Sequence, residues 1–189
     1  MVKFRLFLFV FTVICVSSQA QLDKNSWLLG GSGRISLTSQ TATVATTYRD
    51  FNVSIKPNVG YFLFDRFAAG ALIGFSYDRL KTNYYVNSGT EYALGTFARY
   101  YLLKKEKQVN LLAQGSYLHR IGVLANVSSQ ISSDVFTLTT GPVIFLNSVV
   151  GLEITGNYEL TKPSNNQNIN KISNLFLSIG LQIHLEKDN

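Results

Sequence analysis

The chain has 189 residues, of which 46% are hydrophobic and only 15% are charged, and its formal net charge is +6. This length is sufficient for one domain with a sizeable core, but so low a charged fraction is unusual for a water-soluble surface. No run after the leader approaches the roughly 18 apolar residues of a membrane helix, which argues against a helical membrane protein. The modest positive charge is compatible with phosphate-rich lipid headgroups and gives little support to nucleic acid binding.

The N-terminal segment predicts a secretory signal peptide. Lys3 and Arg5 form a short basic region, and an apolar stretch follows from Leu6 to Val16. Ser18 and Ala20 then place small residues at the two positions that a signal peptidase recognises, so we expect cleavage after Ala20. The apolar stretch is too short for a membrane anchor.

The one cysteine, Cys15, lies inside this leader and is not preceded by the Gly or Ala of a lipoprotein site. The mature chain is therefore predicted to contain no disulfide. The sequence after the leader has no Pro-rich linker and no long block of charge. We expect residues 1–20 to be a cleaved signal peptide and residues 21–189 to form one domain of an exported protein.

Apolar residues in the mature chain alternate with small or polar residues, and this period of two is typical of β-strands. The segments with this pattern, in chain order, are 26–38, 54–63, 67–78, 92–102, 109–119, 135–146, 150–160 and 174–185. The clearest is 150–160, where Leu152 and Ile154 oppose Gly151 and Glu153. The pattern predicts eight strands, each with one apolar face.

The connections between these segments alternate in length. Short turns are expected at 65–66, 104–108 and 147–148, and longer polar loops at 38–52, 79–91, 120–133 and 161–171. Strands of about ten residues, with short turns at one end and long loops at the other, are the layout of a transmembrane barrel. We therefore predict an all-β fold: an eight-stranded antiparallel up-and-down β-barrel with short periplasmic turns and longer extracellular loops. The last strand must pair with the first, because an open edge in lipid leaves backbone groups unsatisfied.

Aromatic residues on the apolar faces gather at the two ends of the predicted strands. Those beside the long loops are Tyr77, Tyr92, Tyr117 and Tyr158, and those at the short-turn end are Trp27, Tyr61, Phe67 and Tyr100. Amphipathic rings in two bands are typical of a protein that crosses both membrane interfaces. The pattern predicts an aromatic girdle at each edge of the apolar wall.

Together with the signal peptide and the terminal amphipathic strand, the segments "VGYFLFDRFAAGALIGFSY" and "FARYYL" resemble the small eight-stranded outer-membrane β-barrel family of Gram-negative bacteria, the porin-like outer membrane protein beta-barrel domain group. The resemblance spans the mature chain and implies an outer-membrane location. It also implies outer-membrane lipids, lipopolysaccharide and the barrel assembly machinery as partners. Family members usually end on an aromatic residue, whereas here Leu185 ends the alternation and residues 186–189 follow.

The faces opposite the apolar wall carry charged and amide side chains. The predicted lumen set is Arg34, Lys56, Asp78, Arg99, Gln114, Glu153, Glu159 and Gln182. Charges inside so narrow a barrel must be paired or hydrated, so we expect a hydrogen-bonded plug in which Glu153 pairs with Arg34 or Arg99. The alternative is a narrow path for water or ions.

Basic residues also gather near the loop end of the predicted barrel. They are Arg49, Arg79, Lys81, Arg120, Lys162 and Lys171. Ordinary solvation and contact with lipopolysaccharide phosphates both explain them. The two readings are equally supported by the sequence.

The sequence offers no catalytic constellation. His119 is expected to face outward at a strand end, and Ser116 lies on the opposite face of the same strand and cannot pair with it there. We therefore expect no enzyme, no catalytic residues, no metal and no cofactor. Two functions remain open: a monomeric structural or interaction barrel whose loops contact envelope or external partners, and a narrow porin-like channel for small solutes or ions.

Overall fold

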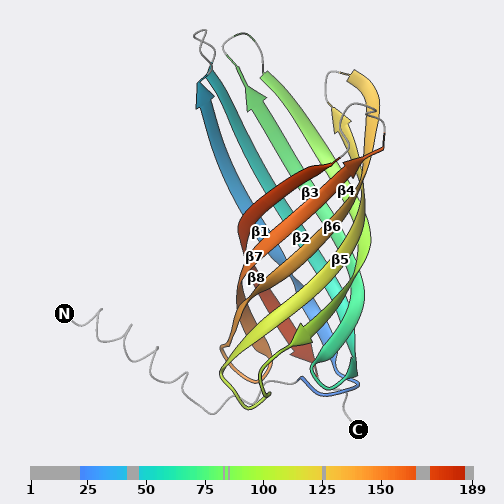
Figure 1. Ribbon diagram of the computed structural model, residues 1–189, viewed down its shortest axis with the longest axis vertical. Helices are drawn as coiled ribbons and strands as arrows, with labels where there is room; N and C mark the ends of the chain where they lie inside the picture. The colour runs from blue at the N-terminus through green and yellow to red at the C-terminus, as the bar shows by residue number, and fades with distance from the viewer. Residues whose placement is uncertain are drawn as a thin grey trace, which may run out of the picture.

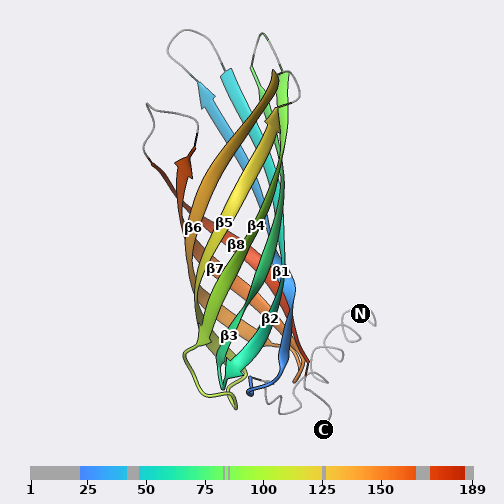
Figure 2. The same cartoon turned by 90° about the vertical axis from the view of Figure 1, so that its right-hand side faces the viewer.

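The computed structural model describes residues 22–41, 47–82, 84, 86–124, 127–164 and 171–185. The predicted signal peptide lies outside these residues. The described part of the chain forms a tall barrel of tilted strands (Figures 1 and 2), in which β1 begins and β8 ends at the same end.

The strands follow one another around the barrel in chain order. They are β1 (Trp27–Thr41), β2 (Thr47–Phe64), β3 (Phe67–Lys81), β4 (Val86–Tyr101), β5 (Val109–Leu124), β6 (Val127–Phe145), β7 (Val150–Pro163) and β8 (Ile172–Leu185). Each pairs antiparallel with its chain neighbours, and β1 pairs with β8. No helix among the described residues is long and apolar enough to span a membrane. The predicted fold class, an all-β closed barrel of eight antiparallel strands, is confirmed.

Alternation along each strand separates the outer wall from the lumen. In β7, Ile154 is 44% exposed, whereas its neighbours Glu153 and Thr155 are 2% and 3% exposed. Large apolar side chains stay uncovered around the wall, and Leu175 at 82% is the most exposed of them on β8. So many exposed large apolar side chains are unusual for a water-soluble monomer, whose apolar patches are small.

The strands are longer than the sequence pattern predicts. They have 14 to 19 residues, and they continue into polar segments that we expected to be loops. β1 runs to Thr41 and β2 begins at Thr47, so most of 38–52 is strand. These segments are rich in Thr, Val, Ile and Tyr, which favour strands, and the backbone ladder does not depend on side-chain polarity.

The connections at the short-turn end lie where the sequence placed them. Residues 65–66 join β2 to β3, and Arg66 adopts a positive φ of 66°. Residues 102–108 and 146–149 make the other two connections, slightly longer than expected.

The seam between β1 and β8 closes over part of its height. Their register pairs Trp27–Gly33 with Ile179–Leu185, and no further pair joins the two strands within the described residues. Above this ladder, a side-chain contact spans the seam inside the barrel, because the Arg34 guanidinium carbon lies 4.2 Å from the centre of the Phe176 ring. The predicted closure is therefore made by backbone at the short-turn end and by stacking further up.

Glycines set how closely neighbouring strands approach inside the barrel. A Cβ atom on Gly95 of β4 would overlap the carbonyl oxygen of Tyr117 and lie 2.7 Å from the Cα of Leu118. A Cβ atom on the outward-facing Gly115 would meet nothing within 4 Å.

We expect Gly95→Ala to lower the free energy of unfolding by about 1–3 kcal/mol, since the backbone of β5 must move to relieve the overlap. Gly115→Ala on the facing strand should change it by less than about 0.5 kcal/mol. Urea titrations of both variants in lipid vesicles would measure the difference. Equal midpoints for the two variants would contradict the close approach of β4 and β5.

Candidate functional site in the barrel lumen

Apolar and aromatic side chains fill the short-turn end of the lumen. The residues here with no exposed surface are Leu22, Leu28, Phe62, Ala68, Tyr101, Leu112, Val143, Phe145 and His184. The segment before β1 lies across this end, because the Arg66 amide donates to the Leu22 carbonyl at 2.7 Å and the Asn25 amide donates to the Phe62 carbonyl at 2.9 Å. We call this layer the floor.

His184 lies at the centre of the floor. Its ring lies 5.5 to 6.0 Å, between centroids, from the rings of Phe62, Tyr101 and Phe145. A carbonyl oxygen can only accept, so Nδ1 of His184 donates to the Val149 carbonyl at 3.2 Å. Nε2 lies 3.1 Å from the Tyr101 hydroxyl. Both ring nitrogens of His184 therefore have partners inside the barrel, and the ring packs within the floor.

A buried ion pair lies directly against the floor. Arg99 Nη1 is 2.6 Å from Glu153 Oε1, and both side chains are 3% exposed. The same guanidinium donates to the Gln114 amide oxygen at 2.8 Å and to the Tyr101 hydroxyl at 3.2 Å. The Gln182 amide donates to Glu153 at 3.4 Å. Of the two partners predicted for Glu153, the structure pairs it with Arg99, and the cluster ties together β4, β5, β7 and β8.

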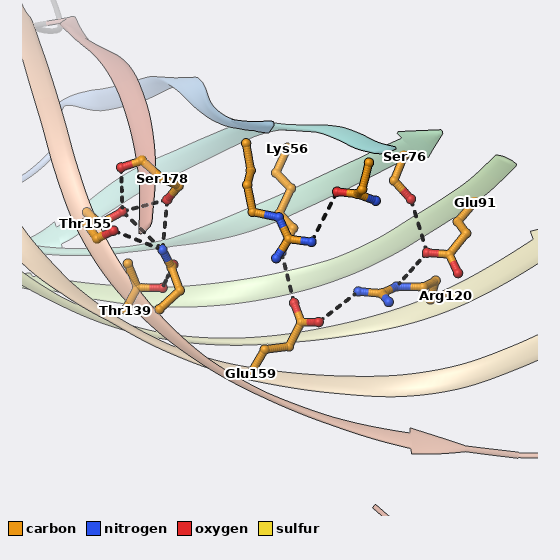
Figure 3. A network of polar contacts seen from close by, with 11 residues as sticks. Lys56, Ser76, Glu91, Arg120, Thr139, Thr155, Glu159 and Ser178 are labelled. Carbon is orange, nitrogen blue, oxygen red and sulfur yellow. Dashed lines mark hydrogen bonds and ion pairs between the residues drawn. The ribbon is translucent and has the colours of Figure 1, made fainter. Parts of the chain in front are cut away.

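A second charged network lies nearer the loop end (Figure 3). Glu159 accepts from Lys56 Nζ at 3.4 Å and from Arg120 Nη2 at 3.3 Å. Arg120 Nε also lies 3.4 Å from Glu91, which accepts from the Ser76 hydroxyl at 3.1 Å. Carboxylates on two strands thus neutralise cations that reach across the lumen from two others.

Two smaller polar clusters complete the lumen. Arg34 donates to the Asn52 amide oxygen at 3.1 Å, and Asn52 donates to Asp78. Asn157 donates to the Ser178 hydroxyl at 2.8 Å, and Thr155 shares that hydroxyl at 2.8 Å (Figure 3). These two clusters join neighbouring strands, whereas the Arg99–Glu153 and Lys56–Glu159 pairs span the lumen.

The space left between these side chains narrows toward the floor. A cavity of about 200 Å³ lies among Arg34, Lys56, Arg120 and Glu159. A cavity of about 40 Å³ follows around Arg99 and its partners. We call the larger cavity the vestibule. It is polar and charged, whereas the floor beyond the smaller cavity is apolar and fully buried.

The structure places all eight side chains of the predicted lumen set inside the barrel. It adds Glu91, Tyr101 and Asn157, which the sequence reasoning did not single out. Glu91 directly precedes the outward Tyr92, so extending the alternation by one residue would have found it.

The predicted girdle residues lie on the outer wall in two groups. Register pairs Trp27 with Tyr61 and Phe67 with Tyr100 at the short-turn end, and the Trp27 and Tyr61 rings lie 5.1 Å apart. At the other end Tyr77, Tyr92, Tyr117 and Tyr158 are all more than one-third exposed.

Arg120 is the exception among the predicted basic surface residues. It follows the outward-facing His119, so alternation turns it into the lumen, where Glu91 and Glu159 hold it. The other five basic residues of that set are exposed: Arg49, Arg79, Lys81, Lys162 and Lys171.

No protein-family model matches the sequence, and no curated protein matches it significantly. Among solved structures, the outer membrane protein OprG from Pseudomonas aeruginosa is similar with a TM-score of 0.58 and 10% identity, over 90% of this chain and 100% of that one. Neisserial surface protein A (NspA) is similar with a TM-score of 0.50 and 14% identity, over 84% of this chain and 96% of that one. The resemblance predicted from the sequence is thereby confirmed at the level of the fold. The chain has the fold of these two outer-membrane proteins, a closed eight-stranded antiparallel β-barrel.

Proposed function

We propose that this protein is an integral barrel of the bacterial outer membrane with a closed lumen, and that it acts as a structural or interaction protein. The observation that carries the proposal is the two-layered closure of the short-turn end. The floor around His184 is apolar and fully buried, and the Arg99–Glu153 pair lies against it. A solute would have to displace both layers to pass.

The outer wall supports a membrane location. Apolar side chains such as Ile154 and Leu177 remain exposed between the two aromatic groups, and no charged residue interrupts β8 from Ile172 to Leu185. An apolar band between aromatic girdles is what a bilayer selects in a barrel. The fold likeness to OprG and NspA agrees with this location.

The loop end supports an interaction role. Strands β1 and β2 continue as polar ladders toward Thr41 and Thr47, well beyond the level of the tyrosines. We infer that these ends project from the outer leaflet and contact envelope components or other cells. The exposed basic residues named above are suited to lipopolysaccharide phosphates. We infer that the barrel is inserted by the barrel assembly machinery, functions as a monomer and catalyses no reaction.

A narrow channel for small solutes or ions is the second candidate. The vestibule favours it, because a charged cavity of about 200 Å³ is suited to admitting a small polar molecule. The floor argues against a channel, because this buried apolar layer closes the lumen beyond the vestibule.

Vesicle swelling separates the two candidates. Liposomes that contain the purified, refolded barrel should swell in small sugars and amino acids no faster than protein-free liposomes, whereas liposomes that contain a general porin should swell quickly. Swelling above the protein-free rate would favour the channel and contradict the closed lumen.

A further inference from the structure

A groove crosses the outer wall over β3 to β7. Its volume is about 640 Å³, and its lining is mainly apolar. Register places Ala69, Ala98 and Gly115 side by side on three adjacent strands, so small residues line the base of the groove. The space above Gly115 is open, since even a Cβ atom there would meet nothing within 4 Å.

Large side chains border this row of small residues. The rings of Tyr117 and Phe136 lie 4.9 Å apart on one border, and Leu138 and Tyr158 continue it onto β6 and β7. Leu138 is 66% exposed, so it stands out from the wall. A furrow of small residues beside a tall apolar ridge fits a thin, flexible hydrocarbon chain.

A polar cluster caps the loop end of the groove. His119 lies two residues beyond Tyr117 on the same outward face, and its Nδ1 is 2.9 Å from Asp134 Oδ1. The Tyr117 hydroxyl donates to the same oxygen at 2.9 Å. Register places Lys162 of β7 directly beside Asp134. These ionisable groups lie beyond the girdle residues Tyr117 and Tyr158, at the interface level where charges on the outer wall cost little and can meet lipid headgroups.

The hydrogen bonds show which groups remain available to a ligand. A carboxylate only accepts, so His119 and Tyr117 both donate to Asp134. Nε2 of His119, whose side chain is 49% exposed, and the exposed ammonium group of Lys162 are then left to face the surroundings. An ammonium group with a second polar nitrogen nearby is complementary to a phosphate with adjacent hydroxyls.

We propose that the groove and its cap bind one molecule of lipid A, the lipid anchor of lipopolysaccharide. One acyl chain lies over Gly115 and Ala98, and a phosphate contacts Lys162 and His119. The proposal rests on the outer-membrane location inferred above, because the cap lies at the loop end and so at the level of the outer leaflet.

Native mass spectrometry of the refolded barrel, released from nanodiscs that contain lipid A or phosphatidylglycerol, tests the site. The wild type should retain one lipid A. Gly115→Leu should abolish retention by filling the groove. Gly156→Leu is the matched control, since Gly156 is another outward glycine, its nearest atom to an added Cβ is 3.8 Å away, and it lies outside the groove. Lys162→Ala should weaken retention about fivefold.

Three results would overturn the site: no lipid A retained by the wild type, equal loss in both leucine variants, or equal retention of phosphatidylglycerol. Folding of each variant is checked on a denaturing gel, where the unheated folded barrel migrates differently from the boiled sample. If Gly115→Leu does not fold, Lys162→Ala and His119→Ala replace it as tests, because they change exposed side chains. Both should then weaken retention of lipid A, and unchanged retention in both would overturn the site. A barrel that inserts into bilayers but retains no lipid A overturns only this site, whereas failure to insert overturns the proposed function.

Discussion

Glu153→Ala should lower the free energy of unfolding of the barrel by about 3–5 kcal/mol. The change removes the carboxylate 2.6 Å from Arg99 and leaves that guanidinium, 3% exposed, without its counter-ion. It also removes the acceptor of the Gln182 amide. The loss is measured as a shift of the urea midpoint in lipid vesicles.

Two further variants show that the loss comes from the buried pair. Glu106→Ala removes an exposed carboxylate from the connection between β4 and β5 and should shift the midpoint little. The double variant Arg99→Met, Glu153→Leu should recover much of the loss, because replacing both charges leaves neither ion uncompensated. A midpoint for Glu153→Ala equal to that of Glu106→Ala would show that the pair does not hold the lumen together.

Ile154→Arg should cost about 2–4 kcal/mol of folding free energy in a bilayer. Ile154 is 44% exposed on the outer face of β7, between the level of Leu152 and that of the girdle residue Tyr158. A cation at mid-bilayer depth must draw in water or thin the membrane. The cost is measured by a folding titration into vesicles.

Val123→Arg is the matched control for depth. Val123 has a similar exposure of 46% on the outer face of β5, but it lies six residues beyond the girdle residue Tyr117, near the loop end of the strand. Arginine there should cost no more than about 1 kcal/mol. Equal costs at the two positions would mean that the outer wall does not meet a bilayer.

Alternation was enough to predict the faces of the barrel, because a period of two needs no knowledge of what lies opposite. It placed Glu153 inside and Ile154 outside, and the structure agrees. The ion-pair partner of Glu153 was harder to predict. Glu153 pairs with Arg99, whereas Arg34 bonds Asn52 and stacks on Phe176. Which inward positions come to the same level depends on the shear and tilt of a closed sheet. Those quantities are properties of the closed sheet and not of any one strand.

The polar ends of the strands were also hard to predict from the sequence. Thr41 and Thr47 continue a ladder whose side chains carry no hydrophobic period, so their strand state depends on the partner strand alone. Arg120 was missed for the same reason: the predicted strand ended at residue 119, whereas β5 continues to Leu124 and turns Arg120 into the lumen. The cap of the outer groove joins Tyr117, His119, Asp134 and Lys162 from three strands, and register alone brings them together.

Single-channel recording in planar bilayers tests the closed lumen most directly. The wild-type barrel, inserted at a density checked by fluorescence, should give no steady current above that of the bare bilayer. Glu153→Ala should raise the leak, because it loosens the layer of side chains against the floor. A steady wild-type conductance that Glu153→Ala leaves unchanged would contradict the account and favour a channel.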